Sequence, residues 1–350
     1  MDSATSTISS KHELLRNLLK QVSRLFYTTL VVVPANVRDQ VSLAYLFARA
    51  ADTIADTDLI DRPRRLGFLN RFKEQFVGDE MDWTQIRTIQ QATSSLQQDS
   101  AERTLLERLD ECFRIFHTCS PDDRHRIQRL MTTLTQGMEM DLSTFSGTSV
   151  VDLTALKTLD DLDRYTYYVA GCVGEFWTSL MCAHRKALTN WDIQQMSEVG
   201  VRFGKGLQLT NIVKDIAFDL QKGRCYIPEM MLAEAALKPQ DLLDQNNLSR
   251  FRPVLSKLVR MAVEHLDQGW LYTMAIPRYE TRLRLACMWP ILSAGESLKL
   301  VMSSPELLNP AVKVKIPRSK VYQIMTMTTG TVGCGYAGTA YWGHLRKQIV

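Results

Sequence analysis

Two pairs of aspartates, each four residues apart, are the most chemically suggestive feature of the sequence. Asp52 and Asp56 lie in the segment ARAADTIADT, and Asp215 and Asp219 lie in QLTNIVKDIAFDLQKGR. Four residues make about one turn of an α-helix, so the two carboxylates of a pair are expected on one helix face. At about 6 Å and an effective dielectric constant of about 20 they repel by roughly 3 kcal/mol, which makes each pair a candidate cation-binding site.

Further polar side chains extend each predicted stripe along the same helix face. They are Tyr45 and Arg49 in the first helix, and Gln208 and Asn211 in the second. The other faces of both segments are apolar, as expected of helices in a protein interior. Mg²⁺ typically binds one or two carboxylates while phosphates and water complete its shell, so the stripes predict Mg²⁺ and a phosphorylated substrate. The alternative is a solvated helix face with local basic partners, and it stays open for either pair taken alone.

The composition is that of an ordinary globular protein. The chain has 350 residues, of which 45% are hydrophobic and 23% charged, enough for one large domain or two small ones. The net charge of +4 is dispersed without long Lys/Arg runs, so nucleic acid is not an expected partner. The first residues lack a basic region followed by an apolar run, and we therefore expect a cytoplasmic protein.

Helix signals dominate the sequence, whereas the alternation typical of half-buried strands is nearly absent. No internal repeat or Gly/Ser/Pro-rich linker divides the chain. The sequence therefore predicts an all-α, single-domain bundle over residues 1–350, with residues 1–12 as a flexible N-terminal tail. The two aspartate-bearing helices lie roughly 160 residues apart in sequence and are expected to face each other across a central apolar cavity.

Four sequence blocks, in this order, resemble the squalene and phytoene synthase family over roughly residues 20–320. The blocks are SRLF at 23–26, YLFARAADTIAD at 45–56, YTYYVAGCVGE at 165–175 and GLQLTNIVKDIAFDLQKGRCYIP at 206–228. Members of this family are head-to-head prenyltransferases with an all-α isoprenoid synthase fold. The resemblance therefore implies this fold and an enzyme that acts on prenyl diphosphates.

The resemblance also implies roles for individual residues. The Mg²⁺ ions that hold the diphosphates would be bound by Asp52, Asp56, Asn211, Asp215 and Asp219. The diphosphate groups would be contacted by Ser23, Arg24, Tyr45, Arg49, Gln208, Lys214 and Arg224. Tyr165 matches the family's catalytic tyrosine, which helps to remove or steer a proton during cyclopropane formation. The small residues around Gly171 and Gly174 match a helix face that lets the substrate chain approach closely.

Two further similarities concern the product. Tyr168, before Val-Ala-Gly, resembles animal squalene synthases more than phytoene synthases, and the segment at 312–325 resembles a stretch near the reductant site of squalene synthases. The resemblance thus implies a squalene synthase that joins two molecules of farnesyl diphosphate through presqualene diphosphate and reduces this intermediate with NADPH.

Other readings stay open at this point. Within the family, the reaction can stop at presqualene diphosphate, dehydrosqualene or phytoene. Outside it, the chain can be a non-catalytic helical protein that binds lipids or partners. No obligate protein partner is inferred, and peripheral contact with a membrane for product release is left open.

Overall fold

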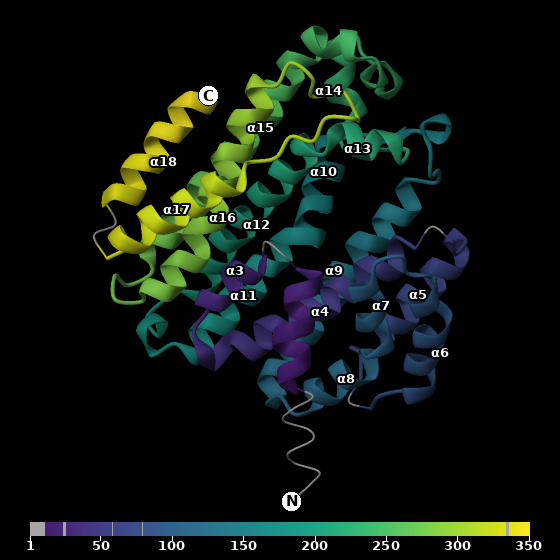
Figure 1. The fold of residues 1–350 in the computed structure, drawn as a ribbon, viewed down its shortest axis with the longest axis vertical. Helices are drawn as coiled ribbons and strands as arrows, with labels where there is room; N and C mark the ends of the chain where they lie inside the picture. The colour runs from purple at the N-terminus through teal and green to yellow at the C-terminus, as the bar shows by residue number, and fades with distance from the viewer. Residues whose placement is uncertain (1–10, 24–25, 58, 79, 334–335) are drawn as a thin grey trace, which may run out of the picture. The chain divides into compact units, whose positions relative to one another are not determined.

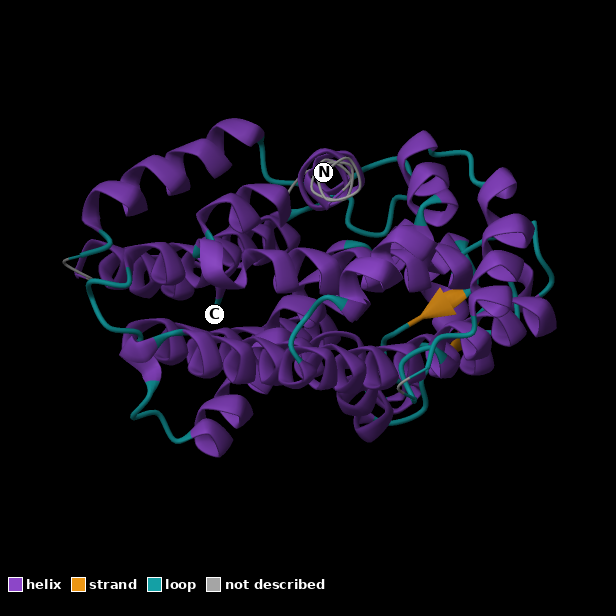
Figure 2. Ribbon diagram, turned by 90° about the horizontal axis from the view of Figure 1, so that it is seen from below, coloured by secondary structure: helices purple, strands orange, loops and turns teal. Residues whose placement is uncertain are grey.

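The computed structural model describes residues 11–23, 26–57, 59–78, 80–333 and 336–350. In this part of the chain nearly all regular structure is helical, and two very short strands form the sheet (Figure 1, Figure 2). The chain divides into two compact units, Met1–Leu142 with Ser179–His184 and Ser143–Thr178 with Arg185–Val350. The predicted all-α class is confirmed. The expectation of a single domain stays a prediction.

The first unit is built from short and medium-length helices. Its elements are η1 (Glu13–Leu18, a π-helix), α2 (Leu19–Val22), α3 (Phe26–Val32), α4 (Ala35–Ala55), α5 (Arg62–Glu74), α6 (Trp83–Thr93), η2 (Ser94–Leu96), α7 (Ser100–Glu107), α8 (Leu109–His117) and α9 (Pro121–Thr144), and the end of α11 (Cys172–His184) also belongs to it. The flexible tail expected over residues 1–12 does not include its last two residues. Lys11 and His12 are helical, and Lys11 pairs with Asp39 at 2.9 Å. Residues 1–10 lie outside the described residues.

A cluster of buried phenylalanines fixes the position of α4 in the first unit. The ring of Phe47 lies 5.0 Å from Phe76 and 4.7 Å from Phe113 between centroids, and Phe72 and Phe116 complete the cluster. Each of these rings is at most 2% exposed. Phe47 precedes Asp52 by five residues, which turns the two side chains roughly 140° apart around the helix. The core face of α4 therefore holds the helix while leaving the aspartates on another side.

The second unit contains the long helices. Its elements are η3 (Val150–Asp152), β1 (Thr154–Ala155), α10 (Leu159–Thr166), η4 (Tyr167–Gly171, a π-helix), the start of α11, η5 (Lys186–Leu188), α12 (Ile193–Lys214), α13 (Ile216–Gln221), β2 (Arg224–Cys225), α14 (Glu229–Ala233), η6 (Pro239–Leu243), η7 (Gln245–Asn247), α15 (Leu248–Ala275), α16 (Thr281–Ser303), α17 (Arg318–Thr331) and α18 (Tyr336–Ile349). Strands β1 and β2 pair in parallel, with Thr154 opposite Arg224.

Glycines bring α12 into backbone contact with both of its neighbours in the second unit. A Cβ atom added to Gly206 would lie 3.0 Å from the backbone nitrogen of Leu266 in α15. A Cβ atom on Gly174 of α11 would lie 2.0 Å from the carbonyl oxygen of Gly200, and one on Gly204 would lie 2.2 Å from that of Ala170. No side chain fits at the two distances near 2 Å, and a Cβ at Gly206 would require the neighbouring atoms to shift. Helix α12 is therefore held closely between α15 and the η4–α11 segment.

This packing corrects one expectation from the sequence. Gly174 was expected to leave room for a substrate chain, but its open side is filled by the backbone of Gly200. Gly171 likewise faces protein atoms, because an added Cβ would lie 3.2 Å from the Val201 side chain. The small residues at these two positions serve helix packing.

Helix α16 is long and apolar enough to cross a membrane, and no other helix among the described residues passes this test. Its most apolar window is 67% buried inside the structure, as in the core helix of many globular proteins, so the signal is weak.

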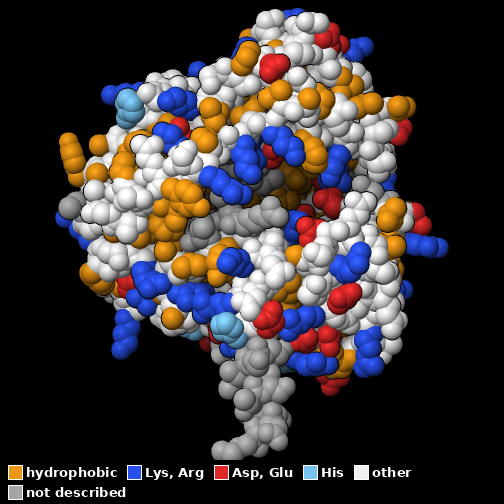
Figure 3. All heavy atoms as spheres, viewed as in Figure 1, with side chains coloured by type: hydrophobic (Ala, Val, Ile, Leu, Met, Phe, Trp, Pro, Cys, Tyr) orange, Lys and Arg blue, Asp and Glu red, His pale blue; other side chains and the backbone are white. Residues whose placement is uncertain are grey.

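Helix α18 packs on the same unit through Trp342, whose indole N–H donates to Asp267 at 2.9 Å and whose ring stacks on Trp270. On the face drawn in Figure 3, basic side chains are spread widely and acidic ones lie among them.

The glycine contacts give a stability prediction. The substitution Gly174→Ala is expected to lower the free energy of unfolding by about 2–4 kcal/mol, because the new methyl group overlaps the Gly200 backbone and forces α11 from α12. The matched control is Gly330→Ala in α17, where no atom lies within 4 Å of the added Cβ and the change is expected to be neutral or slightly stabilising. Denaturant unfolding of both variants measures the difference, and equal stabilities would contradict the packing argument.

Candidate active site

The first aspartate pair lies at the C-terminal end of α4. Asp52 is in the last turn of this helix, and Asp56 is the residue that follows it, with φ −96° and ψ 6°. The Asp56 backbone N–H donates to the Asp52 carbonyl oxygen at 2.9 Å, so the helical hydrogen-bond pattern reaches this residue. The carbonyl end of a helix carries partial negative charge, which disfavours carboxylates and favours a cation.

Arg49 neutralises part of this negative charge. Its Nη1 donates to Asp52 Oδ2 at 2.7 Å, and its Nη2 donates to the Glu102 carboxylate in the first turn of α7. The Arg49 Nε is buried and has no hydrogen-bond partner among the residues that the structure describes. A buried donor without an acceptor is unfavourable, so this guanidinium is suited to a further anion.

The surroundings of Asp52 disfavour its charged form. Burial raises the pKa of Asp52 to about 6, the charges of Asp56, Glu102 and Asp141 act in the same direction, and Arg49 opposes them. The Asp52 side chain is nevertheless 47% exposed to solvent, so an ion can reach the carboxylate. A reachable carboxylate crowded by other carboxylates is an environment that a divalent cation stabilises.

Tyr45 and Ser23 belong to the same cluster. Burial raises the pKa of Tyr45, a hydrogen bond with Ser23 and the charge of Arg49 lower it, and the charge of Asp52 raises it. Ser23 itself is buried. The structure therefore brings these predicted residues together within the first unit. Arg24, which was also predicted to contact diphosphate, lies outside the described residues.

Two acidic residues of this cluster were not found by sequence reasoning. Glu102 lies 50 positions after Asp52, and Asp141 lies 89 positions after it, each in a segment without a recognisable motif. Both act on Asp52 through tertiary packing. Spacing along one helix identifies neighbours within that helix, but it gives no signal for these two.

The second aspartate pair lies at a break between two helices. Helix α12 ends at Lys214, Asp215 has φ −100° and ψ 10°, and α13 begins at Ile216. The expectation of one uninterrupted stripe from Gln208 to Asp219 is therefore wrong, because Asp219 belongs to a separate short helix. The Asp219 N–H still donates to the Asp215 carbonyl oxygen at 3.0 Å, which keeps the two residues one turn apart.

Lys214 supplies the positive charge at this second pair. Its Nζ lies 2.6 Å from Asp215 Oδ2, and the Asp215 side chain keeps 46% of its exposure. Gln208 is partly exposed on α12 and Asn211 is exposed, three residues further along the same helix. The end of α12 therefore combines an amide, a carboxylate and an ammonium group that solvent can reach.

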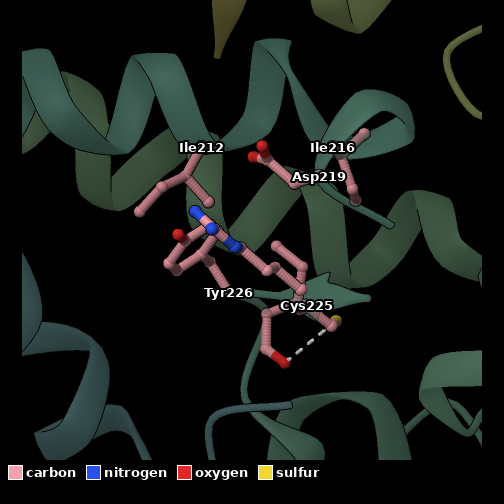
Figure 4. A pocket seen from close by; sticks show the side chains of 7 residues that line it. Ile212, Ile216, Asp219, Cys225 and Tyr226 are labelled. Atoms are coloured by element: carbon pink, nitrogen blue, oxygen red, sulfur yellow. Dashed lines mark hydrogen bonds between the residues drawn. The ribbon is translucent and has the colours of Figure 1, made fainter. Parts of the chain in front are cut away.

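Asp219 and Arg224 line one small pocket in the second unit (Figure 4). The complete lining is Ile212, Ile216, Asp219, Arg224, Cys225, Tyr226 and Ile227. Gly223, with φ +74°, makes the left-handed turn that leads from α13 into β2 and so to Arg224. In this structure the pocket has no room for a water molecule, so it shows which acidic, basic and apolar side chains lie together and not a ligand cavity.

Tyr165 is connected to this pocket through Tyr226. The two rings stack at 4.7 Å between centroids with an interplanar angle of 25°, and both residues are buried. Tyr165 is in the last turn of α10, directly before the π-helix η4. Tyr226 was not singled out from the sequence, although it stands inside the block at 206–228 that resembles the family. Stacked aromatic faces stabilise nearby positive charge.

A larger hollow of about 470 Å³ lies in the first unit but contains none of the predicted site residues. It is lined by the start of α4, the end of α8, and the pair Asp123 and His184, whose Nε2 lies 2.9 Å from the carboxylate. Asp123 also accepts from Gln40 and pairs with Arg126. Burial alone would raise the pKa of Asp123, but these partners and His184 outweigh it and lower the pKa. Its polar groups are thus engaged with each other, and the hollow is not the predicted site.

The donor sets fit Mg²⁺ completed by a phosphorylated ligand. Among the described residues, no group of three or more His, Cys, Asp or Glu side chains is arranged to hold a metal ion without further ligands. Each aspartate pair offers two carboxylates, and Mg²⁺ characteristically takes one or two carboxylates together with water and phosphate oxygens. Whether both pairs share one cavity stays a prediction.

The fold is shared with several solved isoprenoid synthases. The structure of TcSQS with the ligand BPH1237 superposes with a TM-score of 0.77, at 21% identity, over 97% of this chain and 91% of that one. A dehydrosqualene synthase in complex with ligand gives a TM-score of 0.62, at 19% identity, over 93% of this chain and 98% of that one. These likenesses define the class as an all-α isoprenoid synthase fold.

Curated relatives include synthases with different products. The squalene synthase of Cyberlindnera jadinii is 26% identical over 90% of this chain and 67% of the relative. Squalene synthase ERG9 of Saccharomyces cerevisiae is 26% identical over 85% and 63%. The 15-cis-phytoene synthase of Enterobacter agglomerans is 28% identical over 69% of each chain. The chain thus spans about two thirds of the length of these relatives.

The family model described as squalene/phytoene synthase matches residues 19–320. The chain belongs to this family, whose members are prenyltransferases of isoprenoid biosynthesis. Family substrates are prenyl diphosphates, and the family is typically Mg²⁺-dependent. The predicted family resemblance is confirmed.

The negative cluster at the end of α4 gives a second stability prediction. In metal-free protein near pH 7, Asp52→Asn is expected to raise the free energy of unfolding by about 1–2 kcal/mol, after allowing for solvent screening of a half-exposed carboxylate. The pKa of Asp52 in the folded protein, about 6, exceeds its ordinary value of 3.8. Lowering the pH below 6 therefore stabilises the wild type and reduces the difference in unfolding free energy between the wild type and the Asn variant. Urea unfolding at several pH values measures it. A destabilised Asn variant near pH 7 would contradict the prediction.

Proposed function

We propose that the chain is a squalene synthase that joins two molecules of farnesyl diphosphate head to head and uses Mg²⁺ and NADPH. The observation that carries the proposal is the burial of Asp52 among other carboxylates at the carbonyl end of a helix, which together raise its pKa to about 6. Such a cluster is unfavourable until a cation arrives. The family match and the squalene synthases among the relatives support the substrate and the product.

In this proposal Asp52, Asp56, Asp215 and Asp219 bind Mg²⁺, and Asn211 adds an amide oxygen. Bound Mg²⁺ supplies the positive charge that neutralises the departing diphosphate. Arg49 and Lys214 contribute further charge at the two aspartate pairs, where each is held by an ion pair. Diphosphate contacts by Ser23, Arg24, Tyr45, Gln208 and Arg224 belong to the same proposal.

Tyr165 is proposed to act on the carbocation that ionisation leaves. The stacked rings of Tyr165 and Tyr226 present π-electron faces, which stabilise positive charge without reacting with it. The Tyr165 hydroxyl is proposed to receive or steer the proton that is lost when the cyclopropane ring of presqualene diphosphate closes. For the second step NADPH, when bound, would supply the hydride for the rearranged carbocation that remains after the second diphosphate leaves.

A second candidate function is a non-reducing synthase of the same family. The phytoene synthase among the relatives and the fold shared with a dehydrosqualene synthase favour it. Cytoplasmic localisation, with peripheral membrane contact for release of the product, is part of the main proposal. Its support is chemical, since squalene is a hydrocarbon that leaves water for an apolar phase.

The product decides between the two candidate functions. Purified protein incubated with farnesyl diphosphate and Mg²⁺ is expected to accumulate presqualene diphosphate without NADPH and squalene with NADPH, as followed by chromatography and mass spectrometry. A product unaffected by NADPH would contradict the reductive step, and selective use of a C20 diphosphate would indicate phytoene. If no diphosphate is released under any of these conditions, the chain is a non-catalytic binding protein.

A matched pair of tyrosine variants tests the proposed proton transfer. Tyr165→Phe and Tyr226→Phe both keep the stacked rings and remove one hydroxyl, so they are expected to fold alike. We expect Tyr165→Phe to slow formation of presqualene diphosphate by about 100-fold or more, in the range of general acid–base effects, and Tyr226→Phe to change it less than about ten-fold. Single-turnover kinetics measure this step. Equal effects would assign the contribution to the aromatic pair as a whole.

A further inference from the structure

Glu102 is the second carboxylate that binds the guanidinium of Arg49, in addition to Asp52. Arg49 Nη1 bonds Asp52 and Nη2 bonds Glu102, so one side chain joins two carboxylates through separate nitrogens. Glu102 is only 21% exposed, and it sits in the first turn of α7, where the helix dipole favours a negative charge. Asp99 caps the same helix and accepts the Glu102 backbone N–H at 3.2 Å. Glu102 is thus a fixed anion.

A cation that binds Asp52 affects the two hydrogen bonds of Arg49 differently. A divalent cation at Asp52 competes with Arg49 for the carboxylate oxygens, because both are positively charged ligands of the same group. If the cation takes Oδ2, the oxygen that Arg49 Nη1 contacts, Arg49 loses its bond to Asp52, whereas its bond to Glu102 does not involve that group. A guanidinium held by one nitrogen keeps its position and presents its remaining donors to a new anion.

We propose that Glu102 is a positioning residue, which retains Arg49 beside the site when Asp52 binds Mg²⁺ and so directs Nη1 to the diphosphate. The inference rests on the proposed Mg²⁺–diphosphate function of the aspartates and assigns a residue that motif spacing does not reveal. Without the Glu102 carboxylate, Arg49 turns fully to Asp52 and competes with the cation. Glu102 therefore acts on both metal and diphosphate affinity through Arg49.

Asp141 provides the contrast that separates positioning from a general charge effect. Its charge, like that of Glu102, disfavours the ionised form of Asp52. Arg49 Nη2, however, donates its hydrogen bond to the Glu102 carboxylate. If Glu102 acted only through the local field, Glu102→Gln and Asp141→Asn would have similar effects.

The test measures binding, with inorganic pyrophosphate and Mg²⁺ as the probe and isothermal titration calorimetry as the readout. Mn²⁺ binding followed by electron paramagnetic resonance gives the metal affinity independently of turnover. Glu102→Gln is expected to weaken pyrophosphate binding by about ten-fold, as for the loss of a charge-assisted hydrogen bond. Glu107→Gln, at an exposed position of the same helix, is expected to match the wild type.

Glu102→Asp is the decisive variant. It keeps the charge and its place near the start of α7, but its carboxylate is one methylene too short for the bond to Arg49. If Glu102 positions Arg49, the Glu102→Asp protein is expected to bind pyrophosphate nearly as weakly as the Glu102→Gln protein. If Glu102 acts only through its charge, the Glu102→Asp protein is expected to bind it about as tightly as the wild type. If Glu102→Gln does not fold, as judged by circular dichroism and thermal unfolding, Glu102→Asp and Asp141→Asn still give opposite results under the two explanations.

A double variant tests the route through Arg49. In an Arg49→Gln background, adding Glu102→Gln is expected to change pyrophosphate affinity less than two-fold, because the group that Glu102 positions is gone. The inference is overturned if the two substitutions reduce pyrophosphate affinity multiplicatively in the double variant. It is also overturned if Glu102→Gln and Asp141→Asn reduce that affinity equally. A wild type that binds no Mg²⁺–pyrophosphate would overturn the proposed function itself, and with it the inference.

Discussion

The accumulation of carboxylates where helices end is the constraint on which the site depends. Asp52 and Asp56 stand at the end of α4, and Asp215 stands where α12 stops. The partial negative charge of the helix ends adds to the repulsion between the carboxylates. At the first pair Arg49 offsets only part of it, since burial and the neighbouring carboxylates keep the pKa of Asp52 raised. The arrangement lowers stability in the metal-free chain and favours cation binding, as is common where function and stability compete.

Tight packing keeps these unfavourable groups in place. In the first unit, α4 is fixed by Phe47 within a cluster of buried rings, so its end cannot move away from Glu102 without exposing aromatic surface. In the second unit, α12 is fixed by backbone contacts at Gly200 and Gly206. Close-packed interiors deform little, so strain at a helix end is not relieved by small shifts. The core therefore stabilises the charges that the site requires.

The sequence predicts the parts of the site that depend on local periodicity. The helix carrying Tyr45, Arg49 and Asp52 follows from apolar and polar positions repeating every turn, and the structure confirms it. The break at Asp215 could not be predicted in this way, because one residue with ψ near 10° interrupts the helix without disturbing the sequence pattern. The contribution of Glu102 and the role of Gly174 in packing arise from contacts between distant segments. Such contacts leave no spacing for a single sequence to show.

The two basic residues differ in a way that makes the aspartate pairs unequal. Arg49 is a rigid fork that reaches carboxylates of two helices, so it stays anchored by Glu102 after Asp52 is taken by another partner. Lys214 pairs with Asp215, the next residue in the chain, and its long flexible stem is freed when that carboxylate binds a cation. The end of α4 therefore offers a preorganised donor, whereas the end of α12 offers an adaptable one. A rigid donor selects the geometry of the anion it binds, and a mobile ammonium group follows charge as it develops.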